Sequence, residues 1–117
     1  MADALLSAIA DGRSLVVRDD GSGGLVLVET TRSGATMTAA ASADGITAVP
    51  SLPGPVLFGR LPPRTGFVAV ESPEDGVRVH LASGVWLATL PHPATATVVF
   101  HDAQGRETER IEIEAPG

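Results

Sequence analysis

The chain has 117 residues and is acidic, with 14 Asp and Glu against eight basic residues and a formal net charge of −6. It contains no Cys, and every basic residue is Arg, which excludes thiolate catalysis, disulfides, thiolate zinc sites, Schiff-base lysines and the P-loop. Because nucleic-acid binding needs a basic surface, nucleic acid is not an expected partner. No stretch approaches the ~18–20 apolar residues of a membrane span, so a membrane partner is not expected either.

This length is typical of one domain, and we expect a single β-rich domain over residues 1–117. The N-terminus lacks a secretory pattern, because Asp3 stands where a leader carries basic residues and the apolar stretch 4–10 is too short. The sequence therefore predicts a cytoplasmic protein. A secreted protein whose leader has been removed remains the alternative.

The first segment has the end signals of a short helix. Asp3 is a candidate N-cap and Gly12 a candidate C′ residue, and the apolar side chains Leu5, Leu6 and Ile9 lie between them. A helix of this length is marginal alone. We expect it either to cover one open end of the β core or to bind a partner, including a second copy.

The next segments read as β-strands. Residues 14–18 and 24–30 predict a hairpin joined by the turn 19–23. The strand 24–30 is apolar on both faces, which predicts a central strand covered on both sides. Residues 35–41 alternate Thr with small side chains and predict an edge strand, and 46–49 predicts one further short strand.

Residues 50–64 hold five of the nine prolines and predict a Pro/Gly-rich connector between two β-rich halves. A short apolar piece, 56–58, lies inside it. Beyond it, strands are predicted over 66–71, 77–81, 85–90, 95–101 and 110–114. Strands of this number and length favour an all-β, two-layer antiparallel β-sandwich, with a small β-barrel as the alternative. Trp86, in the apolar run 85–90, is expected to fill the core.

The segment 67–109 contains Phe67-Val-Ala-Val, Asp75-Gly76, Gly84-Val-Trp-Leu, Leu90-Pro91 and Phe100-His-Asp-Ala-Gln-Gly-Arg106. This pattern resembles small immunoglobulin-like domains of unknown function in high-GC bacteria, which often close a strand–Trp–Pro segment against a final Asp-x-x-Gly hairpin. The resemblance covers about a third of the chain. It implies an immunoglobulin-like sandwich and carries over no catalytic residue.

Candidate catalytic chemistry rests on three residues, His80, His101 and Asp102. If the strands of His80 and His101 pair, the two imidazoles converge, and Asp102 or His92 completes an acid–base or metal cluster. No metal-ligand spacing is present, so surface histidines on polar strand faces are the competing interpretation. The sequence predicts no metal and no cofactor.

These observations favour a non-enzymatic protein-interaction module or accessory subunit. The partner is expected to be another protein, including a second copy of the chain as a homodimer. The candidate binding residues are Leu5 and Ile9 in the first segment and Met37 and Thr38 in the edge strand. The alternative is a small β-barrel enzyme or ligand carrier that uses His80 and His101.

Overall fold

The structure is a computed structural model that describes residues 4–10, 12–21, 24–34, 36–41, 46–50, 54–72, 76–91 and 95–114. In this part of the chain all secondary structure is β, in antiparallel pairs. The strands are β1 (Ala4–Ala10), β2 (Arg13–Asp19), β3 (Leu25–Thr30), β4 (Thr36–Ala41), β5 (Ile46–Val49), β6 (Val56–Arg60), β7 (Phe67–Glu71), β8 (Arg78–Ala82), β9 (Val85–Thr89), β10 (Thr95–His101) and β11 (Glu107–Glu114).

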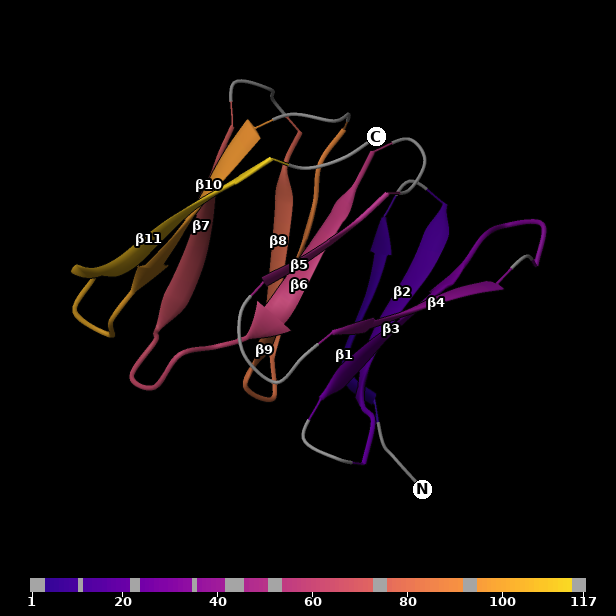
Figure 1. Ribbon diagram of the computed structural model, residues 1–117, viewed down its shortest axis with the longest axis horizontal. Helices are drawn as coiled ribbons and strands as arrows, with labels where there is room; N and C mark the ends of the chain where they lie inside the picture. The colour runs from indigo at the N-terminus through magenta and orange to yellow at the C-terminus, as the bar shows by residue number, and fades with distance from the viewer. Residues whose placement is uncertain are drawn as a thin grey trace.

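The strands form three sheets, where two were predicted. The N-terminal sheet has the order β1-β2-β3-β4, the central sheet β5-β6-β9-β8, and the C-terminal sheet β11-β10-β7. Each order is linear and open-ended, unlike the barrel alternative. Figure 1 shows the three sheets as successive layers, with the central sheet between the other two.

Two apolar cores hold these layers together. The first lies between the N-terminal and central sheets and includes Leu15, Leu27, Phe58 and Leu87. The second lies between the central and C-terminal sheets; among its residues are Leu57, Trp86, Val98 and Phe100. Neighbouring residues of a strand point to opposite faces, so Phe58 enters the first core and Leu57 the second. The two inner strands of the central sheet, β6 and β9, are therefore buried on both faces.

The predicted N-terminal helix is wrong, because residues 4–10 form strand β1, which pairs with β2. Leu6 and Ala8 are buried while Ile9 is 80% exposed, which is the two-residue period of a strand. Gly12 has a φ of 77° and lies in the turn between β1 and β2, where such a conformation suits Gly. Pairing with β2 satisfies the backbone of a segment too short for a stable helix.

The predicted strands at 14–18, 24–30, 35–41 and 46–49 and those of the C-terminal half are confirmed, as is the edge position of β4. The prediction that 24–30 is covered on both sides is wrong. In β3, Leu25, Leu27 and Glu29 are buried, whereas Val26 and Val28 on the other face are partly exposed. The strands covered on both sides are β6 and β9, and every residue of β9 is buried.

The proline-rich stretch 50–64 therefore contains a core strand, β6, between its prolines. After it the chain crosses from the central to the C-terminal sheet. The Gly66 N–H donates to the His101 carbonyl at 2.7 Å, and a Cβ built at Gly66 would lie 2.9 Å from the backbone of Ala103. The absence of a side chain at Gly66 is what allows the crossing to lie against the β10–β11 turn.

Trp86 fills the second core as predicted: it is 0% exposed. Its ring meets Phe100 edge-to-face, with centroids 6.0 Å apart.

The described part of the chain contains no helix long and apolar enough to cross a membrane.

Candidate functional site

In the part of the chain that the structure describes, each outer sheet has one broad face that no other sheet covers, and these two faces differ in chemistry. The face of the N-terminal sheet turned away from the first core is called the N-terminal face. The registers place its residues in three rows across the sheet. Its described residues are Ala4, Ser7, Ile9, Ser14, Val16, Arg18, Val26, Val28, Thr30, Thr36 and Thr38.

Only one residue of this described set, Arg18, is charged. The middle row runs Ser7, Val16, Val28, Thr38, and Val16 and Val28 are partly exposed. Charged residues are usually frequent on a solvent-facing sheet. Hydroxyl and branched apolar side chains in their place make this face less costly to desolvate than a charged one, because burying a charge costs far more than burying a hydroxyl.

The structure brings two of the four predicted binding residues onto the N-terminal face. Ile9 lies in the row of Ser14, Thr30 and Thr36, while Thr38 belongs to the middle row. Leu5 is partly buried and packs against the first core. Met37 is paired with Glu29 in the backbone register, and its side chain lies outside the described residues.

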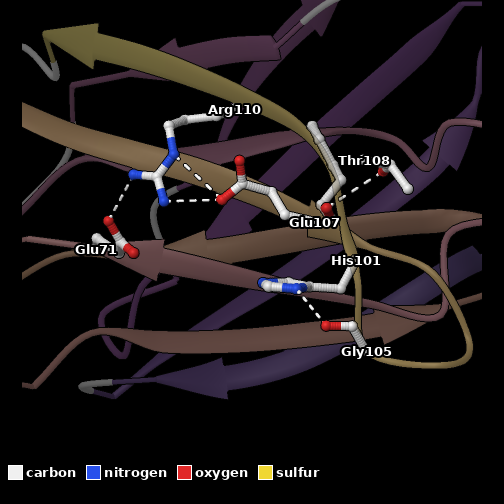
Figure 2. Close-up of polar contacts among 7 residues, drawn as sticks. Glu71, His101, Gly105, Glu107, Thr108 and Arg110 are labelled. Atoms are coloured by element: carbon white, nitrogen blue, oxygen red, sulfur yellow. Dashed lines mark hydrogen bonds and ion pairs between the residues drawn. The ribbon is translucent and has the colours of Figure 1, made fainter.

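The opposite outer surface, the C-terminal face, is acidic. Its described residues are Phe67, Ala69, Glu71, Thr95, Thr97, Val99, His101, Glu107, Arg110, Glu112 and Glu114. Arg110 bridges two of these carboxylates: its Nη1 lies 2.9 Å from Glu71 Oε1 and its Nη2 lies 2.8 Å from Glu107 Oε1 (Figure 2). Arg110 was not among the residues predicted from the sequence. Glu107 and Arg110 share this face because the β10–β11 register shifts between Phe100 and His101. Strict alternation along 107–114 would have put them on opposite faces, so the sequence pattern gave no signal for this pair.

The ion pairs shift the pKa values of Glu107 and Arg110 in the directions that favour their charged forms. The hydrogen bond from Arg110 is the main cause that lowers the pKa of Glu107 below its ordinary value, and the positive charge of Arg110 adds to it. The same hydrogen bonds, to Glu107 and Glu71, raise the pKa of Arg110. Both side chains are solvent-exposed, so the cluster orders the face without making a reactive group.

The candidate catalytic residues do not converge. His101 lies on the C-terminal face, where its ring stacks on Phe67 at a centroid distance of 4.3 Å and its Nδ1 lies 3.3 Å from the Gly105 carbonyl (Figure 2). His80 is in β8 of the central sheet, paired with Leu87. Cross-strand neighbours share a face, so the His80 side chain points toward the N-terminal sheet, while His101 lies on the far side of the C-terminal sheet.

Asp102 has a turn-forming role. Its Oδ1 accepts the N–H groups of Gln104 and Arg106, each at 2.9 Å, and its own N–H donates to the Arg106 carbonyl. This is the side-chain-to-backbone pattern that Asp supplies in tight turns. His92 lies outside the described residues. Within the described ranges, no three His, Asp or Glu side chains gather in a way that could hold a metal ion.

A hollow at one end of the second core is lined by Ile46, Arg60, Pro62, Phe100, Glu109 and Ile111. Its volume is about 90 Å³, whereas sites for small-molecule ligands usually measure roughly 300–1,000 Å³. The hollow has room for a few water molecules. Neither histidine lines it.

Comparison with known proteins returned no match: no family model fits the chain, and no curated protein or solved structure is significantly similar to it.

Proposed function

We propose that the protein is a non-enzymatic protein-interaction module, and that it binds its partner through the N-terminal face. The observation that carries this proposal is the composition of that face: a four-stranded sheet surface with Arg18 as the single charged residue of the described set and Ile9 80% exposed. Protein interfaces are depleted of charge at their centre. The middle row of this face, with Val16 and Val28, has that character.

We further infer an immunoglobulin-like sandwich for the central and C-terminal sheets. If β5 to β11 are lettered A to G, their orders become A-B-E-D and G-F-C, the orders of a constant-type immunoglobulin domain. The chain departs from that pattern in having no Cys and no Tyr, and Trp86 is on the fifth of these strands where antibody domains carry Trp on the third. On this proposal, β1 to β4 are an added layer over the A-B-E-D sheet.

The positions of the histidines also support a binding role over an enzymatic one. His80 and His101 belong to different sheets and point away from one another, and the hollow at the second core is too small for most ligands. General acid–base catalysis needs both groups within reach of one substrate. The two described histidines that could act as acid and base, His80 and His101, thus lie on separate surfaces.

The experiment is affinity capture from the native host with matched variants of the two outer faces. Val28→Arg places a charge at the middle of the N-terminal face, and Thr97→Arg places the same charge on the central strand of the C-terminal face. Proteins captured by the wild type and by Thr97→Arg, and lost with Val28→Arg, are the expected result. Capture that both variants retain, or that only Thr97→Arg loses, would contradict the proposed surface.

A further inference from the structure

The charge of this chain is distributed unevenly between its two outer faces. The described part of the C-terminal face carries Glu71, Glu107, Glu112 and Glu114 against one Arg, while the described N-terminal face carries Arg18 alone. The two faces lie on opposite sides of the layered molecule (Figure 1). A chain with net charge −6 repels its own copies, and this repulsion depends strongly on which faces meet.

We propose that the partner at the N-terminal face is a second copy of the chain, with the two N-terminal sheets stacked about a twofold axis. This proposal rests on the proposed function, because it uses the same face. A contact between two C-terminal faces would oppose their glutamates. A contact between unlike faces leaves a further face exposed on each copy and leads to open chains. Pairing of the two N-terminal faces alone gives a closed dimer without opposed acids.

The electrostatic cost of this arrangement is small. Stacked sheets are about 10 Å apart, so two three-layered copies joined at their N-terminal faces hold their acidic faces roughly 50 Å from one another. The Debye length in physiological salt is about 8 Å. Repulsion between those faces is therefore screened in the dimer.

The area of the face places the contact among the small protein interfaces. Four strands spaced about 4.8 Å apart, with about six residues each, cover roughly 400 Å² per copy. The total of roughly 800 Å² is below the ~1,200 Å² at which stable interfaces begin. We therefore expect a weak dimer that dissociates on dilution.

The test is sedimentation velocity from about 1 µM to about 1 mM, the range that brackets a weak dimer. The mass should rise from 11.9 kDa toward twice that value. Val28 lies in the middle row, next to the expected axis, so Val28→Arg and Val28→Glu should each remain monomeric. An equimolar mixture of the two should dimerise again, because the opposite charges then meet across the axis. Thr97→Arg should dimerise like the wild type.

Other outcomes overturn the proposal. A wild type that stays monomeric at every concentration rules out the second copy, and the affinity capture described above then decides separately whether the face binds another protein. A dimer that persists in Val28→Arg points instead to pairing along the edge of β4, one strand away. Circular dichroism verifies the fold of each variant, and Thr30→Arg, in the neighbouring row, replaces Val28→Arg if that variant unfolds.

Discussion

Arg13 and Glu29 form an ion pair that is buried between the N-terminal and central sheets. Arg13 Nη1 lies 3.6 Å from Glu29 Oε1, and the two side chains are 3% and 6% exposed. The same Nη1 donates to the Gly54 carbonyl at 3.3 Å, which belongs to the segment that leads into β6. The pair therefore connects the β2–β3 hairpin to the central sheet at one end of an otherwise apolar core.

Replacing Glu29 with Gln should destabilise the protein by about 3 kcal/mol. The Arg13 guanidinium would keep its contact with Gly54 but lose a buried carboxylate, and removing one member of a buried pair typically costs about 3–5 kcal/mol. Chemical denaturation monitored by Trp86 fluorescence measures the change. An unchanged midpoint would show that the pair is solvated in solution.

A matched control separates burial from charge. Asp19 and Arg60 form a second pair between the same two sheets at 3.3 Å, with side chains 41% and 33% exposed. Because exposed pairs are worth about 0–1 kcal/mol, Asp19→Asn should cost less than Glu29→Gln. The double variant Arg13→Met/Glu29→Leu should lose less than Glu29→Gln alone, since it leaves neither member of the pair as an uncompensated buried charge.

Trp86→Ala should destabilise the protein by about 3–5 kcal/mol, the usual cost of removing a fully buried large aromatic side chain. Among the described residues, the indole N–H has no hydrogen-bond partner. Trp86→Phe should therefore cost only about 1–2 kcal/mol, because it removes volume without breaking a hydrogen bond. Thermal unfolding of the three proteins gives the order. Equal losses for Ala and Phe would contradict this prediction, because a smaller aromatic ring would then recover none of the packing that Trp86 provides.

The strands were largely predictable from the sequence because turn residues mark their ends. Asp102 and Gly105 delimit β10 and β11 by the hydrogen bonds of an ordinary tight turn. The prediction of an N-terminal helix was wrong because candidate cap residues indicate where a segment begins and ends, but they do not fix the conformation between those points. Tertiary pairing with β2 decided the conformation of residues 4–10.

The layering and the outer faces were harder to predict. The period of two tells which residues share a face, but it does not tell which face a further sheet will cover. Because Val26 and Val28 are apolar, the sequence predicted that their face of β3 is buried. In the structure this face points outward, and both side chains are partly exposed. Likewise, His80 and His101 each sit on a strand with suitable alternation, and only the strand order shows that they belong to different sheets.

Gly66→Ala should destabilise the protein by about 1–3 kcal/mol, the usual cost of overpacking. The new methyl group would lie 2.9 Å from both the Ala103 Cα and the Asp102 carbonyl oxygen, so the crossing segment and the β10–β11 turn would have to separate. Gly34→Ala is the control, because φ there is 91° with nothing within 4 Å of an added Cβ. It should show only the backbone strain, about 1 kcal/mol. In native-state hydrogen exchange, the backbone N–H of residue 66 should exchange faster in Gly66→Ala than in the wild type, and Gly34→Ala should leave it unchanged.

The pH dependence of stability should reveal the ion pair between Glu107 and Arg110. The pKa of Glu107 is lowered from 4.5 in the folded protein, first by its hydrogen bond with Arg110. A carboxyl whose pKa is lower when folded adds stability above its unfolded pKa and loses it as the pH falls through the folded value. The wild type should therefore melt above Glu107→Gln at neutral pH, and the difference should shrink below about pH 4.

Thermal scans between about pH 3 and about pH 8 measure this convergence. Glu112→Gln removes a charge from the same strand and face, and so controls for net charge. About 1 M salt should also reduce the difference at neutral pH, because both partners are exposed and their attraction is screened. A gap between wild type and Glu107→Gln that persists unchanged at pH 3 would mean that the Glu107 side chain acts through packing and not through its charge.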